Sequence, residues 1–161
     1  MQLQHQAIPA PGSILIRAGD AADQGAIDAL IAGERLNPND IRAENFIVAV
    51  DGGEIVGAAQ VRRHPDGARE LGSLVVRADH RGRGISGRLI ETLLAREATA
   101  VFMITGSSRA HTFARFGFVP AGGPLVPRSI RTNRMKGQIY GGLAALTHFR
   151  RPQRLVILCR P

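Results

Sequence analysis

The chain has 161 residues, of which 44% are hydrophobic, and a formal net charge of +8. A chain of this length fits one domain that buries about 70% of the surface exposed in its unfolded state, so neither a metal nor a disulfide is needed to hold its core. The only cysteine, Cys159, excludes an intrachain disulfide, and no cluster of cysteine and histidine has the spacing of a zinc site.

The N-terminal segment and the apolar runs bear on location. Residues 1–17 lack a basic region followed by a long apolar run, and no apolar stretch approaches the roughly 20 residues of a membrane span. Together with the single cysteine, these features predict a cytoplasmic protein without membrane contact and without a bound metal. We expect one domain over residues 13–161 and an N-terminal extension over residues 1–12.

The charge is distributed unevenly. Residues 1–100 carry 13 acidic and 11 basic side chains, whereas residues 101–161 carry 10 basic and no acidic ones. Two interpretations are open: a solvated arginine-rich surface, or a field that attracts an anionic ligand. The absence of tryptophan, the single tyrosine and the lack of a nucleic-acid-binding motif argue against nucleic acid as the partner.

Residues 13–100 show alternating strand and helix patterns. Residues 13–18 predict a strand, and Asp20 can cap a helix over residues 21–34, whose apolar residues recur at helical spacing. Two strand-like runs then flank Asp51-Gly52-Gly53, a strong hairpin signal because Asp-Gly pairs tolerate positive φ. Residues 70–76 predict a third strand of the same sheet.

A glycine-rich loop follows, with the sequence RGRGISG over residues 81–87. It precedes a predicted helix over residues 84–97 and a buried strand over residues 100–105. Gly82, Gly84 and Gly87 match the G-x-G-x-x-G fingerprint of NADP-binding oxidoreductases. However, a hairpin precedes the loop and no acidic residue follows Glu97, both of which argue against a dinucleotide-binding fold.

The stretch ELGSLVVRADHRGRGISGRLIETLLA resembles the acetyl-CoA-binding core of the GCN5-related N-acetyltransferase (GNAT) superfamily. Arg81 to Gly84 match the R-x-x-G-x-G/A signature, although Ser86 stands where the signature ends in Gly or Ala. The resemblance extends over about residues 13–120. It implies an α/β (α+β) fold, with a mixed, mainly antiparallel sheet of about six or seven strands flanked by helices.

The resemblance also implies an activity: transfer of an acetyl group from acetyl-CoA to a primary amine of a small molecule or an amino acid, by direct attack in a ternary complex. Glycines expose successive backbone N–H groups, and the positive end of the following helix attracts a pyrophosphate. The preceding strand is expected to bind the pantetheine arm by strand addition. The expected acetyl-CoA contacts are Leu74, Val75, Val76, Arg81, Gly82, Arg83, Gly84, Ile85, Ser86 and Gly87.

Two residues are candidates for accepting the proton of the amine. Glu70 matches a position where some GNAT enzymes carry a general base, and His64 has a side chain that ordinarily titrates near pH 6.5. The structural alternative for Glu70 is a solvated carboxylate at a strand end, paired with Arg69 or another arginine. The alternative for His64 is a surface histidine in a turn.

The general acid of the family has no match. Many GNAT enzymes carry a tyrosine where this chain has Phe113, which cannot donate a proton. Water, Tyr140, or the hydroxyls of Ser107 and Ser108 are the remaining donors. A CoA-binding regulatory or interaction protein without efficient turnover is therefore a second hypothesis.

The last 40 residues end in a predicted strand over residues 155–159, which in this superfamily would pair beside the strand near Phe118. Before it, residues 129–149 predict a helix broken around Gly141 and Gly142. This segment is either a structural cover, a homodimer contact, or a basic wall of the acceptor pocket. In the last case an anionic acceptor is expected, with a carboxylate bound by Arg128, Arg131 and Arg134.

Overall fold

The computed structural model describes residues 13–34, 36, 40–147 and 153–161; from residue 140 to 147 only the backbone is described. The predicted extension over residues 1–12 lies outside this part of the chain. The strands are β1 (Leu15–Ala18), β2 (Phe46–Asp51), β3 (Glu54–Arg63), β4 (Arg69–Val76), β5 (Val101–Gly106), β6 (Val119–Pro120) and β7 (Leu155–Arg160). The α-helices are α1 (Gln24–Gly33), α2 (Ile85–Leu94) and α3 (Arg128–Thr147), and short 3₁₀ helices are η1 (Ala21–Asp23), η2 (Ala43–Asn45), η3 (Ala78–His80), η4 (Ser107–Phe116) and η5 (Gly123–Leu125).

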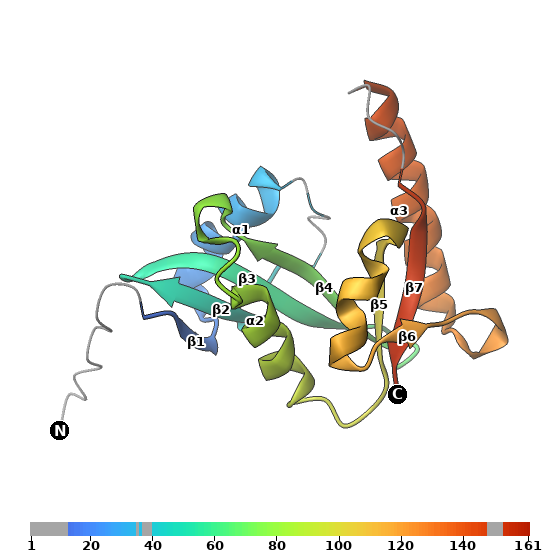
Figure 1. Cartoon of the computed structure of the whole chain (residues 1–161), viewed down its shortest axis with the longest axis horizontal. Coiled ribbons are helices and arrows are strands. Elements are labelled where there is room, and N and C mark those ends of the chain that lie inside the picture. Colours follow the sequence, from blue (N-terminus) through green and yellow to red (C-terminus); the bar gives the residue numbers. More distant parts are fainter. Residues whose placement is uncertain (1–12, 35, 37–39, 148–152) are drawn as a thin grey trace. The chain divides into compact units, whose positions relative to one another are not determined.

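The strands form one seven-stranded sheet in the order β1-β2-β3-β4-β5-β7-β6 (Figure 1). The pair of β4 with β5 is parallel, while β1 with β2, β2 with β3, β5 with β7 and β6 with β7 are antiparallel. The expected mixed, mainly antiparallel sheet is thus confirmed. A doubly wound dinucleotide-binding fold, which needs a mostly parallel sheet, is excluded.

The described residues group into two compact units. Unit 1 contains those up to Gln60 together with Ser73–Leu93, and unit 2 contains Val61–Gly72 together with Leu94–Pro161. Strands β3 and β4 contribute residues to both units. The expected single domain stays a prediction.

In unit 1, the alternation of side chains along the strands assigns α1 and α2 to opposite faces. One face packs against Ile27 and Ile31 of α1, and its buried members are Phe46, Val48, Val50, Ala58 and Val75. The neighbouring position Gly57 faces the other way, because a Cβ there would lie 3.3 Å from Ile85 and 3.4 Å from Leu89 of α2. Small residues on β3 therefore let α2 pack close to the sheet.

The predicted hairpin and helix start of unit 1 are confirmed. Gly52 and Gly53 join β2 to β3 with φ values of 57° and 89°, the positive values that a two-residue turn of this kind requires. The side chain of Asp20 accepts a hydrogen bond from the N–H of Ala22 and caps η1, which leads into α1.

In unit 2, β7 lies between β5 and β6 (Figure 1). The expected pairing near Phe118 is confirmed, since Val119 of β6 pairs with Cys159 of β7. α3 packs on this sheet through Ile130, which is buried in one cluster with Phe102 and Ile157 of the sheet and with Val126, a residue that precedes the helix.

The expected break at Gly141 and Gly142 is wrong, because α3 runs as one helix through both positions. Each glycine lowers helix stability by only about 1 kcal/mol relative to alanine, which neighbouring turns can offset. In the described part of the chain, no helix is long and apolar enough to cross a membrane.

Candidate active site

The loop between β4 and α2 has the backbone shape that the sequence predicts. Gly82 and Gly84 have φ values of 79° and 73°, and a Cβ built on either one meets nothing within 4 Å. α2 begins directly after them, so helix geometry leaves the N–H groups of its first turn without intrahelical acceptors. Glycine is thus required here for conformation, and the open side of the loop leaves its backbone accessible to an anion.

A buried histidine fixes the start of this loop. Nδ1 of His80 lies 2.7 Å from Oδ1 of Asp79, and Nε2 lies 3.2 Å from Oδ2 of Asp51, at the end of β2. From the sequence, Asp51 was predicted only as a turn residue, and His80 was not predicted as a functional residue. No local pattern could have found this pair, because the two residues are 29 positions apart.

Arg77 connects the same segment to β3. Its N–H donates to the carbonyl of Val56 at 2.8 Å, and its guanidinium donates to Asp79 and Glu54, each at 2.8 Å. Hydrogen bonds from Arg77 and, to a smaller extent, from His80 lower the pKa of Asp79 to about 2. The hydrogen bonds that Arg77 donates to Asp79 and Glu54 raise the pKa of Arg77. The loop therefore begins from a segment held by several charge-assisted hydrogen bonds.

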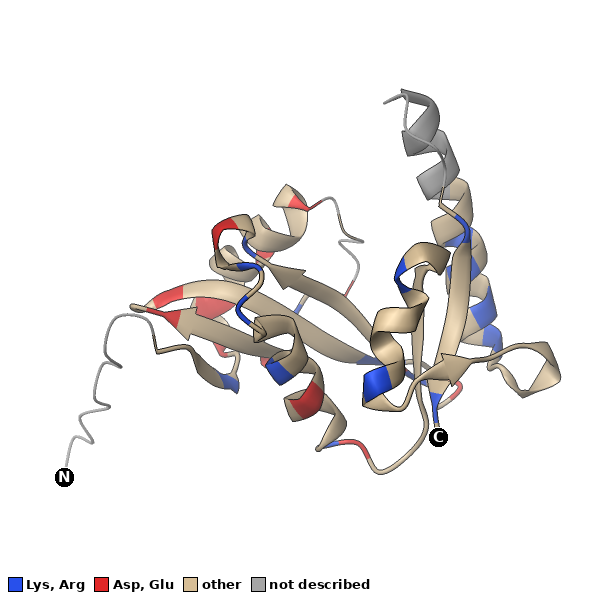
Figure 2. Ribbon diagram, viewed as in Figure 1, with Lys and Arg blue, Asp and Glu red and all other residues tan. Residues whose placement is uncertain are grey.

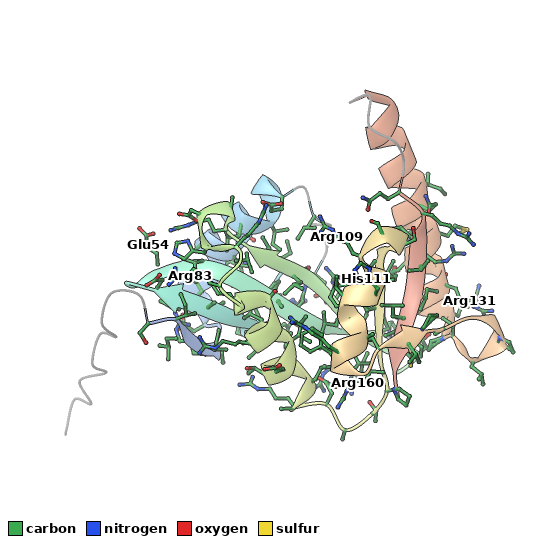
Figure 3. The ribbon with its side chains drawn as sticks, in the orientation of Figure 1. Glu54, Arg83, Arg109, His111, Arg131 and Arg160 are labelled. Atoms are coloured by element: carbon green, nitrogen blue, oxygen red, sulfur yellow. The ribbon has the colours of Figure 1, made fainter. Side chains whose placement is uncertain are left out.

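The two loop arginines are engaged with carboxylates in unit 1. Arg81 donates from Nε to the carbonyl of Val76 at 3.0 Å and pairs with Glu34. Arg83 donates to Oδ2 of Asp51 at 3.0 Å, and Figure 3 labels its side chain near the hairpin. These two side chains are thus engaged with protein groups, whereas the backbone at Gly82 and Gly84 is open.

The strand before the loop contains an unusual residue. Ser73 of β4 has a φ of 51°, a conformation that costs a non-glycine residue about 1–3 kcal/mol. Its Oγ accepts a hydrogen bond of 3.2 Å from Nε2 of the fully buried Gln60. Beyond it, Val75 is buried in the core, while Leu74 and Val76 on the opposite face are half-buried.

Unit 2 holds a buried carboxylate. Glu70 is only 5% exposed, and its Oε2 lies 2.8 Å from Nε2 of His64. The same oxygen accepts a hydrogen bond of 2.9 Å from Nδ2 of Asn133, and Oε1 lies 3.6 Å from Nη1 of Arg62. The two residues that the sequence offered as alternative bases are thus hydrogen-bonded to each other.

This geometry corrects part of the structural alternative for Glu70. The carboxylate is buried rather than solvated, and its arginine partner is Arg62, because Arg69 pairs with Glu97 at 3.3 Å. The side chain of a strand residue alternates between faces, so Arg69 and Glu70 point in opposite directions. His64 is half-buried rather than a free surface residue.

The first turn of α3 is fixed to the β3–β4 turn. Asp66 accepts hydrogen bonds from the N–H of Ser129 at 3.0 Å and from its hydroxyl at 2.9 Å. These bonds, that from the Ser129 N–H above all, lower the pKa of Asp66. Asn133, one turn further along α3, then reaches Glu70. Neither Asp66 nor Asn133 was predicted from the sequence as a site residue, because each acts on a segment 63 residues away.

The three arginines proposed for the acceptor lie on the first two turns of α3. Arg128 and Arg131 are exposed and Arg134 is half-buried. Within the part of the chain that is described, none of them forms an ion pair. Figure 2 shows the basic residues along this helix, and Figure 3 labels Arg131 there. Arg134 follows Asn133 directly, which brings positive charge to the turn of α3 that contacts Glu70.

The candidates for a proton donor are dispersed. Phe113 packs edge-on against Phe118 with ring centroids 6.5 Å apart, and Ser107 and Ser108 are exposed at the start of η4. Tyr140 lies in α3, but its side chain is outside the described residues. A metal-binding cluster of histidine, cysteine or acidic residues is not found among the described side chains.

Residues 42–120 match the family model of the acetyltransferase (GNAT) domain. No curated protein matches the chain by sequence. The chain is structurally similar to N-acetylglutamate synthase from Neisseria gonorrhoeae, complexed with coenzyme A and N-acetyl-glutamate, at a TM-score of 0.69 and 17% identity. That similarity covers 94% of this chain but 35% of the synthase, so the chain spans about a third of that protein's length.

Two other similar structures match over nearly their whole length. Rv2747 from Mycobacterium tuberculosis, in complex with CoA and NLQ, has a TM-score of 0.65 at 17% identity, and covers 90% of this chain and 97% of its own. ElaA from Escherichia coli has a TM-score of 0.64 at 13% identity, and the similarity covers 92% of this chain and 100% of ElaA. The family model, the sheet order and these structures agree, and the chain belongs to the GNAT acetyltransferase superfamily.

Proposed function

We propose that this protein transfers an acetyl group from acetyl-CoA to the primary amine of a small molecule or amino acid. One observation supports catalytic activity in addition to family membership: the carboxylate of Glu70 is buried and lies 2.8 Å from Nε2 of His64, within hydrogen-bonding distance. Burying an ionisable pair is costly unless it is well bonded, and such pairs are frequent at catalytic sites.

In this proposal the loop of unit 1 binds the donor. Gly82 and Gly84 leave room for a pyrophosphate to approach the backbone, and the first N–H groups of α2, at Ile85, Ser86 and Gly87, point toward it. Residues 74–76 of β4 bind the pantetheine arm by main-chain hydrogen bonds, as an added strand. Arg81 and Arg83 contribute positive charge while they hold the loop through Glu34 and Asp51.

Unit 2 supplies proton transfer. The pair of His64 and Glu70 accepts the proton that the amine loses as it attacks the thioester carbonyl. A thiol ordinarily has a pKa of about 8.5, so the departing thiolate is a stable enough anion to leave without a strong acid. For this reason Phe113, at the position where many GNAT enzymes carry tyrosine, is compatible with turnover.

The arginines of α3 recognise the acceptor. Arg134 is half-buried beside Asn133, and an arginine fork fits a carboxylate with two parallel hydrogen bonds. An acceptor that carries a carboxylate, such as an amino acid, is therefore favoured. A homodimer through the exposed side chains of α3 stays a prediction.

The test is incubation of the protein with isotopically labelled acetyl-CoA and a pool of amines, read by mass spectrometry. We expect labelled amide on an amine that also carries an anionic group. If acetyl-CoA raises the melting temperature but no amine is labelled, the protein is the CoA-binding regulatory relative instead. A folded Gly84→Val variant serves as the control without donor binding.

A further inference from the structure

We propose that Nδ1 of His64 is the atom that takes the proton from the acceptor amine, and that Glu70 is a positioning residue held by Asn133 and Arg62. This assignment rests on the proposed acetyl transfer, and it gives the two residues of the buried pair different roles. It also adds Asn133, a residue of α3 far along the chain, to the machinery of the site.

The hydrogen bonds give each atom its role. Oε2 of Glu70 accepts from Nδ2 of Asn133 at 2.9 Å, and the same oxygen lies 2.8 Å from Nε2 of His64. An ionised carboxylate can only accept, so Nε2 must carry the hydrogen of the ring. A neutral imidazole with its hydrogen on Nε2 has its lone pair on Nδ1, which makes Nδ1 the basic atom.

Exposure favours the ring over the carboxylate as the group that meets substrate. The side chain of Glu70 is 7% exposed, and both of its oxygens face protein groups. The side chain of His64 is 13% exposed, and in the described part of the chain no hydrogen bond to its Nδ1 is found. Glu70 is therefore enclosed by partners, while His64 keeps one nitrogen available.

The charges around the ring suit an imidazolium that forms during turnover. Glu70 and Asp66 supply negative charge from β4 and from the β3–β4 turn, and the charge of His64 contributes to lowering the pKa of Asp66. Arg62 of β3 faces the far oxygen of Glu70.

From α3, the groups that contact these carboxylates are Ser129 and Asn133, which are neutral. The arginines of that helix, Arg128, Arg131 and Arg134, form no ion pair with Glu70 or Asp66 in the described part of the chain. A proton on the ring is thus stabilised by the carboxylate of Glu70, to which the ring is hydrogen-bonded, and by the electrostatic attraction of Asp66.

The lone pair of the neutral amine forms a bond to the thioester carbonyl carbon, and Nδ1 of His64 takes the N–H proton. When the tetrahedral intermediate collapses, the carbon–sulfur bond breaks and its electron pair leaves on the thiolate of coenzyme A. The thiolate and the imidazolium then exchange a proton through solvent, which returns the ring to its neutral form.

The first experiment is NMR of the free, parent protein with ¹⁵N-labelled histidine. The signals of His64 are assigned by their loss in a His64→Ala variant. We expect the neutral ring of His64 to carry its hydrogen on Nε2. A hydrogen on Nδ1 would overturn the proposal, whether or not acetyl transfer has been detected, so this result is independent of the proposed function.

The second experiment is chemical rescue. His64→Ala should lower kcat by about 10²- to 10⁴-fold and leave the acetyl-CoA-induced rise in melting temperature unchanged, and imidazole in the buffer should restore part of the rate. Glu70→Gln should also lower kcat, but imidazole should not restore it. His111→Ala, which removes an exposed histidine of η4, is the matched control. Rescue of neither variant, or parental activity of His64→Ala, would overturn the assignment of proton transfer to His64.

The third experiment concerns Asn133. Asn133→Ala should lower kcat without changing the KM for acetyl-CoA, and should increase the fraction of His64 that carries its hydrogen on Nδ1. Lys136→Ala, an exposed change on the same helix, should alter neither property. A merely structural role of Asn133 would lower the melting temperature and leave the tautomer of the remaining folded protein unchanged, which would contradict the proposal.

Discussion

Gly72 lies directly beside the guanidinium of Arg62: a Cβ at position 72 would be 2.5 Å from Nη1 of Arg62. The same nitrogen is 3.6 Å from Oε1 of Glu70. Gly72 is not among the residues with positive φ, so space rather than backbone conformation accounts for the glycine. The absence of a side chain on β4 thus places a cation next to the buried carboxylate.

Gly72→Ala should therefore lower kcat while changing the melting temperature little. The clash is with the end of a flexible side chain, so Arg62 moves and the melting temperature changes little, while kcat falls because Glu70 loses its cation. In an Arg62→Ala background, Gly72→Ala should have almost no further effect on kcat. Gly25→Ala in α1, where a Cβ meets nothing within 4 Å, is the control. Parental kcat in Gly72→Ala would show that the position of Arg62 does not affect the function of Glu70.

Acetyl-CoA should raise the melting temperature, whereas NADPH at the same concentration should not, because only a ligand of the folded state shifts unfolding. Gly84→Val should abolish this shift, since a β-branched residue resists a φ of 73° and blocks approach to the backbone. Gly122→Val, at an extended residue directly before η5 with open space at its Cβ, should retain the shift. Binding of acetyl-CoA by a folded Gly84→Val protein would exclude the loop as the phosphate site.

Asp66 should make stability depend on pH. Its pKa is lower in the folded protein than its usual value of about 4, so its contribution is fully present above that pH and is lost as the pH falls through the folded-state pKa. The difference in the free energy of unfolding between the parent and Asp66→Asn, measured by urea denaturation, should shrink as the pH falls below about 4. Glu44→Gln, an exposed acidic position, is the control. A difference that does not change with pH would argue against this contribution.

The arginines of α3 should determine the preference for an anionic acceptor. The KM of an amino-acid acceptor should be lower than that of its carboxamide, and Arg134→Gln should raise the former by about 10- to 150-fold, the equivalent of roughly 1.5–3 kcal/mol for a charge-assisted hydrogen bond. The KM of acetyl-CoA should hardly change.

Arg109→Gln, an exposed arginine of η4, is the matched control for this series. If the basic residues act only as a general field, both variants should have small effects that fade with added salt, because exposed charges are screened beyond about 8 Å at physiological ionic strength. Equal KM values for the acid and the amide in the parent protein would contradict the hypothesis that the arginines of α3 bind the carboxylate of the acceptor.

The sequence by itself determined the features that depend on neighbouring residues. Asp51, Gly52 and Gly53 specify a tight turn through the φ values they tolerate, and Gly82 and Gly84 specify the loop before α2 in the same way. Runs of apolar and β-branched residues specify β2 and β3, and Asp20 specifies the start of η1. Each of these signals acts within a few residues, so no tertiary contact is needed to interpret it.

Only the tertiary structure decided what surrounds the proposed catalytic pair. The sequence left Glu70 either as a base or as a solvated carboxylate, and burial against His64, Arg62 and Asn133 excluded the second. Asn133 is 63 residues from Glu70, and which distant side chain reaches a buried oxygen depends on how α3 packs on its sheet. Local propensity carries no information on that packing, because a helix with the same pattern could bury its apolar face against many strands.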